Sequence, residues 1–308
     1  MPQAQTLFAR RLESAIGNVL VGRQEAVQLA LTALVAGGHL LIEDRPGVGK
    51  TLLARTLARV VELPFQRIQC TADLLPSDVL GALVYEPATG RLTLRRGPVF
   101  TSVLLADELN RTPPRTQSAL LECMQERRVT IDRESYPLPE PFFVVATQNP
   151  LASAGTYPLP ESQLDRFLMR IRLGHPSAEE EMVVVAREDG HRGIDEMTPI
   201  GTREDLLALQ AAVGAVRVDP EIVAAIVAIA QRTRSTPMVR SGVSTRGAQA
   251  LHRACRARAV VLGRDYVVPD DVRVLLGPVL AHRIVVRGGE GSAENVLGEI
   301  FREANVPE

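Results

Sequence analysis

The chain has 308 residues, 45% hydrophobic and 23% charged, a composition typical of a globular protein of about two domains. A net charge of -1 and a pI of about 6.6 argue against a nucleic-acid-binding protein, which needs a basic surface. The sequence contains no run of about 18 apolar residues and no apolar signal core near its N-terminus. We therefore expect no transmembrane segment and a cytoplasmic location.

The three cysteines match no metal-ligand spacing. Cys70, Cys123 and Cys255 lie far apart in the sequence. An odd and sparse set of cysteines indicates a reducing compartment and buried, unpaired thiols.

The N-terminal half alternates short apolar segments with helical patterns. The apolar segments are rich in Val, Ile and Leu, as in the strands of a buried parallel sheet, and span residues 39–43, 65–71, 102–108, 142–149 and 167–173. The helical patterns cover residues 24–36, 50–62 and 113–127. In the last of these we expect Thr112 as the N-cap and Pro113 as the first helical residue. This order predicts an α/β fold with a doubly wound, parallel, five-stranded sheet.

Strand patterns stop after about residue 175. Helical patterns then cover residues 176–188, 203–216, 220–233, 245–263 and 269–284. We therefore expect an αβα domain over residues 1–175 and a small all-helical domain over residues 176–308.

The stretch "IEDRPGVGKT" (42–51) follows the first predicted strand and leads into a helix, which is the context of a phosphate-binding loop. Asp44 stands where the strict pattern has a glycine, and Lys50 is the only lysine of the chain. Gly47 and Gly49 allow the backbone to approach a phosphate, Lys50 would reach the terminal phosphates, and Thr51 would bind Mg²⁺. The alternative is a Pro-Gly turn that closes a buried strand.

The apolar segment "VLLADE" (103–108) ends in two acids at the sheet edge where ligands of such folds bind. Asp107 would bind Mg²⁺, and Glu108 would act as the general base for the attacking water. An Asp-Glu pair is also a common exit from a strand, but its combination with the loop upstream favours a nucleotide site.

Three further residues are candidates for contact with phosphate groups. Asn149, at the end of a strand, could orient the water, or it could simply form a turn before Pro150. Arg166 could serve as an arginine finger in a neighbouring subunit, or it could pair with Asp165. Arg246 lies in a first helical turn, where a cation opposes the helix dipole, and a phosphate ligand would explain its place there.

The chain resembles the MoxR family of AAA+ ATPases, in the helix-2-insert clade, over nearly its full length. The stretches that match are "GGHLLIEDRPGVGKTLLARTLA", "RIQCTADLLPSDVLG", "ADELNRTPPRTQSALLECMQERRVTI", "VVATQNPLASAGTYPLPESQLDRFLMRI" and "GRDYVVPDDVRVLLGPVLAHRI". The resemblance implies a P-loop NTPase core, a helical lid and ATP hydrolysis with Mg²⁺ in a homo-oligomer, usually a hexameric ring.

The resemblance also implies roles for individual residues. It makes Asn149 sensor 1, Arg166 the finger acting on a neighbouring subunit, and Arg246 sensor 2. It implies two groups of nucleotide contacts, the adenine contacts and the phosphate-loop and Walker B residues: Val21, Gly22 and Gln24, then Pro46, Gly47, Val48, Gly49, Lys50, Thr51, Leu52 and Asp107.

Two segments resemble the hairpin inserts of this clade, at residues 80–100 and 127–142. Both have a strand–turn–strand pattern, with turns expected at 88–90 and 132–135. Members of the family resemble chaperones that remodel protein complexes or aid cofactor insertion, often with a von Willebrand factor A-domain partner. We therefore expect such a partner, a client protein complex and no nucleic acid.

Three alternatives to a chaperone stay open. A metal-chelatase ATPase subunit belongs to a related family, which usually carries longer inserts. A nucleotide-gated scaffold with little turnover is disfavoured by the intact Glu108 and Arg166. A DNA-translocating motor is disfavoured by the near-neutral charge of the chain.

Overall fold

The computed structural model describes residues 3–150, 155–186, 194, 197–287 and 292–304. Five parallel strands form a central sheet in the order β2-β5-β8-β1-β9. Their bounds are β1 (Leu40–Glu43), β2 (Phe65–Gln69), β5 (Val103–Asp107), β8 (Phe143–Gln148) and β9 (Met169–Ile171). All five strands predicted from apolar segments are therefore confirmed, each shorter than its segment, and β9 covers three of the seven residues expected.

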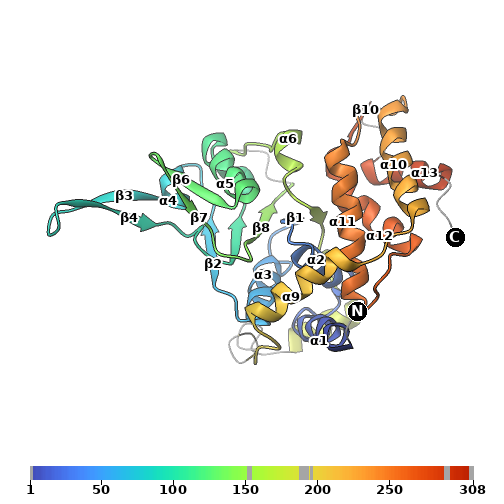
Figure 1. Ribbon diagram of the computed structural model, residues 1–308, viewed down its shortest axis with the longest axis horizontal. Coiled ribbons are helices and arrows are strands. Elements are labelled where there is room, and N and C mark those ends of the chain that lie inside the picture. Colours follow the sequence, from blue (N-terminus) through green and yellow to red (C-terminus); the bar gives the residue numbers. More distant parts are fainter. Residues whose placement is uncertain (1–2, 151–154, 187–193, 195–196, 288–291, 305–308) are drawn as a thin grey trace.

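The two faces of the sheet pack into two different hydrophobic cores. In β5, Val103 and Leu105 belong to one core, and Leu104 and Ala106 belong to the other, because successive side chains of a strand point to opposite faces. The helices of the first core include α1 (Gln3–Val19), α2 (Gln24–Val35) and α3 (Lys50–Arg59). Helices α4 (Pro76–Leu80) and α5 (Pro114–Glu126) pack on the second core (Figure 1).

One helix boundary differs from the expectation. Pro113 is the N-cap of α5, with φ -56° and ψ 148°, and the helix begins at Pro114 rather than at Pro113. Helical backbone angles are disfavoured for a residue that precedes a proline, so Pro113 is extended. The helix therefore begins one residue later than expected, and Pro113 rather than Thr112 occupies the N-cap position. Helix α1 was not among the helices expected from the sequence.

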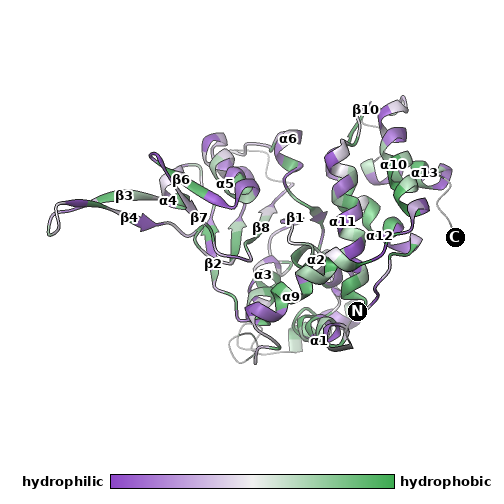
Figure 2. Ribbon diagram, in the orientation of Figure 1, coloured by the Kyte–Doolittle hydropathy of each residue, from purple (hydrophilic) through white to green (hydrophobic). Residues whose placement is uncertain are grey.

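Both expected hairpins are present. Strands β3 (Gly81–Glu86) and β4 (Arg91–Arg96) form the longer one, which projects from the body of the molecule (Figure 1). Figure 2 shows β3 as mainly hydrophobic and the end of β4 as hydrophilic. Strands β6 (Arg128–Ile131) and β7 (Glu134–Pro137) form the other. Its turn is shorter than expected, because Glu134 and Ser135 pair within the ladder and Asp132 takes a positive φ of 59°.

The C-terminal part of the described chain is mostly helical. Its helices are α7 (Ala178–Ala186), α9 (Arg203–Ala212), α10 (Pro220–Ser235), α11 (Thr245–Val261), α12 (Pro269–Leu280) and α13 (Ala293–Glu303). Residues 187 and 188 of the first expected helix lie outside the described residues. A short antiparallel pair, β10 (Val239–Ser241) with β11 (Val285–Val286), corrects the expectation of helices alone. Two- and three-residue strands are too short to produce an alternating sequence pattern.

Helix α11 packs against α2 and α12, so the helical part shares the first core with the sheet. The division at residues 175 and 176 stays a prediction. None of the described helices is long and apolar enough to cross a membrane, and the cytoplasmic location stays a prediction too.

Candidate active site

The loop between β1 and α3 has the shape that a phosphate site needs. Gly47 and Gly49 have φ angles of 86° and 99°, which side-chain-bearing residues rarely adopt. Gly49 is the N-cap of α3, and Lys50 is the first residue of that helix. The backbone N–H groups at this helix start are available to bind an anion.

Asp44, which replaces the first glycine of the pattern, connects the loop by hydrogen bonds to the backbone that follows β9. Its Oδ2 accepts hydrogen bonds from the backbone N–H of Leu173 at 2.9 Å and of Gly174 at 2.7 Å, and its Oδ1 accepts from Arg45 N at 2.8 Å. Burial acts to raise the pKa of Asp44, but these hydrogen bonds and nearby Lys50 outweigh it and lower the pKa. The carboxylate therefore stays ionised and is already engaged by the backbone of Arg45, Leu173 and Gly174.

A cavity of about 650 Å³ opens above this loop. Most of the nucleotide contacts expected from the sequence line it, together with both strand-end acids: Val21, Pro46, Gly47, Val48, Gly49, Lys50, Thr51, Leu52, Asp107 and Glu108. The tertiary fold thus brings together expected contacts as far apart in the sequence as Val21 and Glu108, which are 87 positions apart. The cavity volume lies within the range of small-molecule sites.

Lys50 is almost fully buried, with 9% of its surface exposed. Burial lowers the pKa of Lys50, and the carboxylates of Asp107, Asp44 and Glu108 act in the opposite direction. The ammonium donates to the carbonyl oxygen of Asp44 at 2.6 Å. A desolvated cation in a cavity is suited to bind a phosphate group.

Thr147 of β8 joins the two acids at the end of β5, and sequence reasoning did not single it out. Its hydroxyl donates to Asp107 Oδ1 at 2.6 Å and accepts from the backbone N–H of Glu108 at 2.8 Å. Thr147 is fully buried. Because β8 pairs with β5 in parallel, Thr147 near the end of β8 lies beside the acids at the end of β5. The register between these two strands, which the sequence does not show, would have been needed to predict this contact.

Each acid also has an arginine partner that the sequence analysis missed. Arg67 Nη2 of β2 lies 2.6 Å from Asp107 Oδ2, and Arg111 Nη1 lies 2.8 Å from Glu108 Oε2. Glu108 adopts left-handed backbone angles, φ 59° and ψ 46°, a conformation that costs a residue with a side chain about 1–2 kcal/mol. Both carboxylates therefore have defined positions before any ligand binds.

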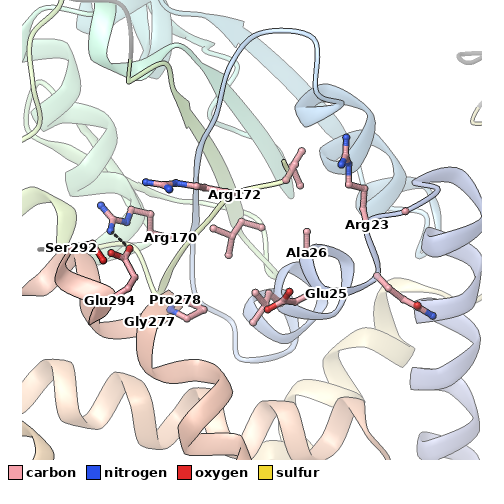
Figure 3. A pocket seen from close by; sticks show the side chains of 14 residues that line it. Arg23, Glu25, Ala26, Arg170, Arg172, Gly277, Pro278, Ser292 and Glu294 are labelled. Atoms are coloured by element: carbon pink, nitrogen blue, oxygen red, sulfur yellow. Dashed lines mark hydrogen bonds and ion pairs between the residues drawn. The ribbon is translucent and has the colours of Figure 1, made fainter. Parts of the chain in front are cut away.

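Three expected contacts lie beside the cavity rather than in its lining. Gly22 and Gln24 line a neighbouring cavity of about 530 Å³, which Figure 3 shows from close by. Asn149 follows the end of β8, at the sheet edge that carries Asp107, and its carbonyl oxygen is 3.4 Å from Asn110 Nδ2.

Arg166 and Arg246 lie together, in a third cavity of about 290 Å³ whose lining includes none of the phosphate-loop residues 46–52. Ser244 caps α11 by accepting from Gly247 N at 3.1 Å, which places Arg246 in the first turn as expected. Asp165 pairs with Arg283 at 2.7 Å and lies 3.9 Å from Arg246 Nε, and no pairing of Arg166 with it is found among the described residues. Among those residues, five arginines and one acid line this cavity, so it favours an anion.

The cysteines are free and buried, as expected. Burial raises the pKa of Cys70 to about 11 and that of Cys123 to about 12, and it also raises the pKa of Cys255. Thiols with such pKa values are poor nucleophiles at neutral pH. They therefore take no part in the chemistry of the site.

Comparisons with known proteins identify the family of the chain. Residues 39–169 match the ATPase family associated with various cellular activities, and residues 231–303 match the AAA lid domain. The chain is 47% identical to the Bacillus subtilis protein YeaC, with 95% of this chain and 92% of that protein covered. It is 39% identical to chaperone MoxR1 of Mycobacterium tuberculosis, with 95% and 81% covered.

A solved structure supports the same family. A crystal structure from Cytophaga hutchinsonii, assigned to an ATPase, superposes with a TM-score of 0.90 at 36% identity and covers 99% of this chain and 98% of that one. Protein MoxR of Paracoccus denitrificans is 32% identical over 89% of this chain and 88% of that protein. The phosphate loop, the paired acids and these relatives together show that the chain belongs to the MoxR family of AAA+ ATPases and hydrolyses ATP.

Proposed function

We propose that the chain hydrolyses ATP with Mg²⁺ in a ring-shaped homo-oligomer and uses the energy to remodel or activate a protein complex. One observation supports the ring-shaped assembly. Arg166 and Arg246 line one cavity, and a different cavity is lined by Lys50, Asp107 and Glu108. Two arginines suited to a phosphate would then serve the nucleotide of a neighbouring copy. Head-to-tail contacts between identical copies generate a ring when the rotation from copy to copy closes, and we propose a hexamer as that ring.

The donors in the cavity suit Mg²⁺, which prefers oxygen ligands and keeps several waters. The Thr51 hydroxyl and the Asp107 carboxylate both line the cavity beside Lys50. Mg²⁺ bound there would neutralise charge on the β- and γ-phosphates. Asp107 would hold the metal with the carboxylate that contacts Arg67, and the Thr147 hydroxyl would keep that carboxylate in position.

In this proposal each of the remaining site residues has a role that follows from its position. The phosphate loop and Lys50 hold the phosphates, and Glu108 accepts the proton of the attacking water. Asn149 orients that water, since it follows the strand that lies between β5 and β1. The arginines of the neighbouring copy, Arg166 and Arg246, stabilise the charge that develops in the transition state.

The client and the partner are proposed from the relatives. One relative is a chaperone by name, and a chaperone must couple nucleotide state to another protein. The β3–β4 hairpin projects from the ATPase body and exposes Val84, Tyr85 and Leu92. We propose that the hairpins transmit the nucleotide state to a client complex, with a von Willebrand factor A-domain protein as partner.

A nucleotide-gated scaffold with slow turnover is the second candidate. The observation that favours it is the engagement of both acids by arginine, Asp107 by Arg67 and Glu108 by Arg111. Turnover per site of the wild-type chain, measured with and without a client, separates a scaffold from an active chaperone.

The shared site is tested by mixing two inactive variants. Lys50→Ala subunits lack the phosphate-binding lysine, and Arg166→Ala subunits lack the finger. If the finger acts on a neighbour, a one-to-one mixture restores intact sites at about a quarter of the interfaces, because each site then needs one residue from each copy. Absence of recovery, with mixed rings shown by native mass spectrometry, would contradict the shared site. Arg172→Ala is the matched control, because Arg172 lines neither the cavity of Lys50 nor the cavity of Arg166. This variant should keep full activity on its own.

A further inference from the structure

Two arginines beside Gly37 lie close together without an acid between them. Arg127 is the C-cap of α5, and Arg253 lies on α11. A Cβ atom added to Gly37 would stand 3.0 Å from Arg253 Nη2 and 3.7 Å from Arg127 Nη2. The two nitrogens are therefore at most 6.7 Å apart, which is the sum of these distances. Two like charges this close destabilise each other unless an anion compensates them.

The partners of these arginines within the chain are few and weak. Arg127 Nη2 donates to the carbonyl oxygen of Gly37 at 3.2 Å, and Arg127 Nη1 lies 3.8 Å from the exposed carboxylate of Glu140. No hydrogen bond or ion pair of Arg253 is found in the described part of the chain. Desolvation and, after it, the charge of Arg127 lower the pKa of Arg253. Exposed ion pairs contribute at most about 1 kcal/mol, so positive charge remains uncompensated here.

The cavity that contains the two arginines does not supply the missing anion. Both line the cavity of about 290 Å³, in which Asp165 is the one acid among the described residues. Arg283 Nε already holds Asp165 at 2.7 Å. A carboxylate whose two oxygens each accept a hydrogen bond of about 2.8 Å can bridge two nitrogens at this separation. The position of Arg127 and Arg253 therefore fits an oxyanion that another molecule supplies.

One acid at the nucleotide cavity lacks an arginine partner. The acids that line this cavity, among the described residues, are Asp107, Glu108 and Glu181. An arginine engages each of the first two, at 2.6 and 2.8 Å. Glu181 is exposed, and although its charge acts on Arg23, no hydrogen bond or ion pair of its carboxylate is found among the described residues. Glu181 is therefore available for contact with another molecule.

Helix α7, which carries Glu181, is itself poorly covered. It has no buried residue, and four consecutive apolar side chains, Met182 to Val185, are between 45% and 78% exposed. Its first turn contains Glu179, Glu180 and Glu181, and the helix has no basic residue. An exposed apolar run beside an acidic turn suits a partner surface that carries positive charge.

We propose that Glu181 of one copy pairs with Arg253 and Arg127 of the neighbouring copy in the ring. The pairing rests on the proposed function, in which the nucleotide cavity of one copy faces the cavity of Arg166 in the next. That arrangement brings the unpaired acid of the first cavity toward the unpaired arginines of the second, and their charges are complementary. The pairing adds a contact between the proteins to a site that would otherwise be joined through the nucleotide.

The test exchanges the two charges and measures assembly. All variants carry Glu108→Gln, which should keep ATP bound, and sedimentation velocity with ATP and Mg²⁺ gives the protein concentration at half assembly. We expect Arg253→Glu and Glu181→Arg each to raise this concentration at least about 10-fold, because like charges then face each other. The double variant, with both changes, should return to within about threefold of the parent, because the charges are again complementary.

Two measurements control for folding and for the general charge of α7. Glu179→Arg is the matched control, because Glu179 lies in the same turn of α7 but does not line the nucleotide cavity. It should leave the concentration at half assembly within about threefold of the parent, as for a charge outside the contact. Without nucleotide, the Tm of Arg253→Glu should equal or exceed that of the parent, because one of two close cations is removed.

Three outcomes would overturn the pairing. Single variants that assemble like the parent would show that neither charge lies in the interface. Impaired single variants without rescue in the double variant would show that Arg253 and Glu181 have different partners. Equal effects of Glu179→Arg and Glu181→Arg would show a general effect of charge on α7.

The same experiments separate this pairing from the proposed function. If the Glu108→Gln chain stays monomeric with ATP, the ring itself is wrong and the pairing fails with it. If the mixing experiment recovers activity but the charge exchange does not rescue assembly, only the pairing of Glu181 with Arg253 is refuted.

Discussion

The ammonium of Lys50 donates to the backbone carbonyl oxygen of Asp44 at 2.6 Å. Asp44, which departs from the phosphate-loop pattern, therefore positions Lys50, the lysine of that pattern, through its backbone carbonyl. The side chain of Asp44 points elsewhere, to the backbone of Leu173 and Gly174. The loop keeps its anion-binding shape because Gly47 and Gly49, and not residue 44, have positive φ angles.

Replacing Asp44 by glycine restores the strict pattern and should cost stability rather than binding. Three backbone N–H groups lose their acceptor, so we expect the free energy of unfolding to fall by about 1–3 kcal/mol. Kd for ATP should stay within about threefold, since the carbonyl of residue 44 remains. Urea unfolding and calorimetry measure the two quantities. A large loss of affinity with unchanged stability would contradict this role, and Asp44→Asn, which keeps an acceptor oxygen, is the control.

Replacing Glu108 by glutamine should separate binding from hydrolysis. The amide keeps the size of the side chain but cannot accept the proton of water, so kcat should fall by at least about 100-fold. Kd for ATP should change little, because Lys50 and the loop bind the phosphates. Single-turnover hydrolysis and calorimetry measure the two effects. If the variant hydrolyses ATP at the wild-type rate, the base lies elsewhere.

Replacing Thr147 by valine removes the hydroxyl that joins the acids while nearly preserving shape. The Asp107 carboxylate and the Glu108 N–H both lose a partner, so we expect about 1–3 kcal/mol lower stability. Because Asp107 is then less well positioned, the ATPase rate should need a higher Mg²⁺ concentration to reach half of its maximum. Thr147→Ser keeps the hydroxyl and should recover most of both. Mg²⁺ titration of the ATPase rate and thermal unfolding test this, and equal behaviour of the valine and serine variants would refute it.

Stability should fall between pH 6.5 and pH 4 because of buried histidine. His39 Nδ1 accepts from Val144 N at 3.0 Å, and Nε2 lies 2.9 Å from Met124 O, so the ring is neutral and donates from Nε2. Burial lowers the pKa of His39 to about 4. The unfolded chain, with the ordinary pKa of about 6.5, binds the proton more tightly. The folded state is therefore favoured fully above pH 6.5 and loses about 3 kcal/mol by pH 4.

Urea unfolding between pH 7 and pH 4 measures this slope. The His39→Met variant removes the proton-linked part, so its free energy of unfolding should depend less on pH. A variant with the wild-type slope would show that other groups dominate. His282 acts in the same direction, since burial and the charge of Arg283 lower its pKa as well, and a residual slope in the variant is expected from it.

Several parts of the fold and site could be predicted because they depend on local sequence. The five strands are apolar segments, and the phosphate loop is one short stretch whose glycines are demanded by backbone angles. The Asp-Glu pair follows a strand directly. In each case the residues that act together are neighbours in the sequence, so a sequence pattern is enough to predict the structure that they form.

Other parts escaped prediction because they depend on which strands and helices meet. Thr147 reaches Asp107 only through the β5–β8 register, and Arg67 only through the β2–β5 register. The pairs of β10 with β11 are too short to show a pattern. Helix α1 was missed although Leu12 and Ile16 are fully buried in the first core.

The sequence by itself determined the family, the sheet and the residues of the phosphate loop, because each lies in a contiguous motif with its own physical requirement. The tertiary structure decided how those motifs combine. It placed Arg166 and Arg246 in one cavity and Lys50 in another, and it brought Arg253 beside Arg127. Such relations arise from packing between distant segments, which a one-dimensional pattern does not encode.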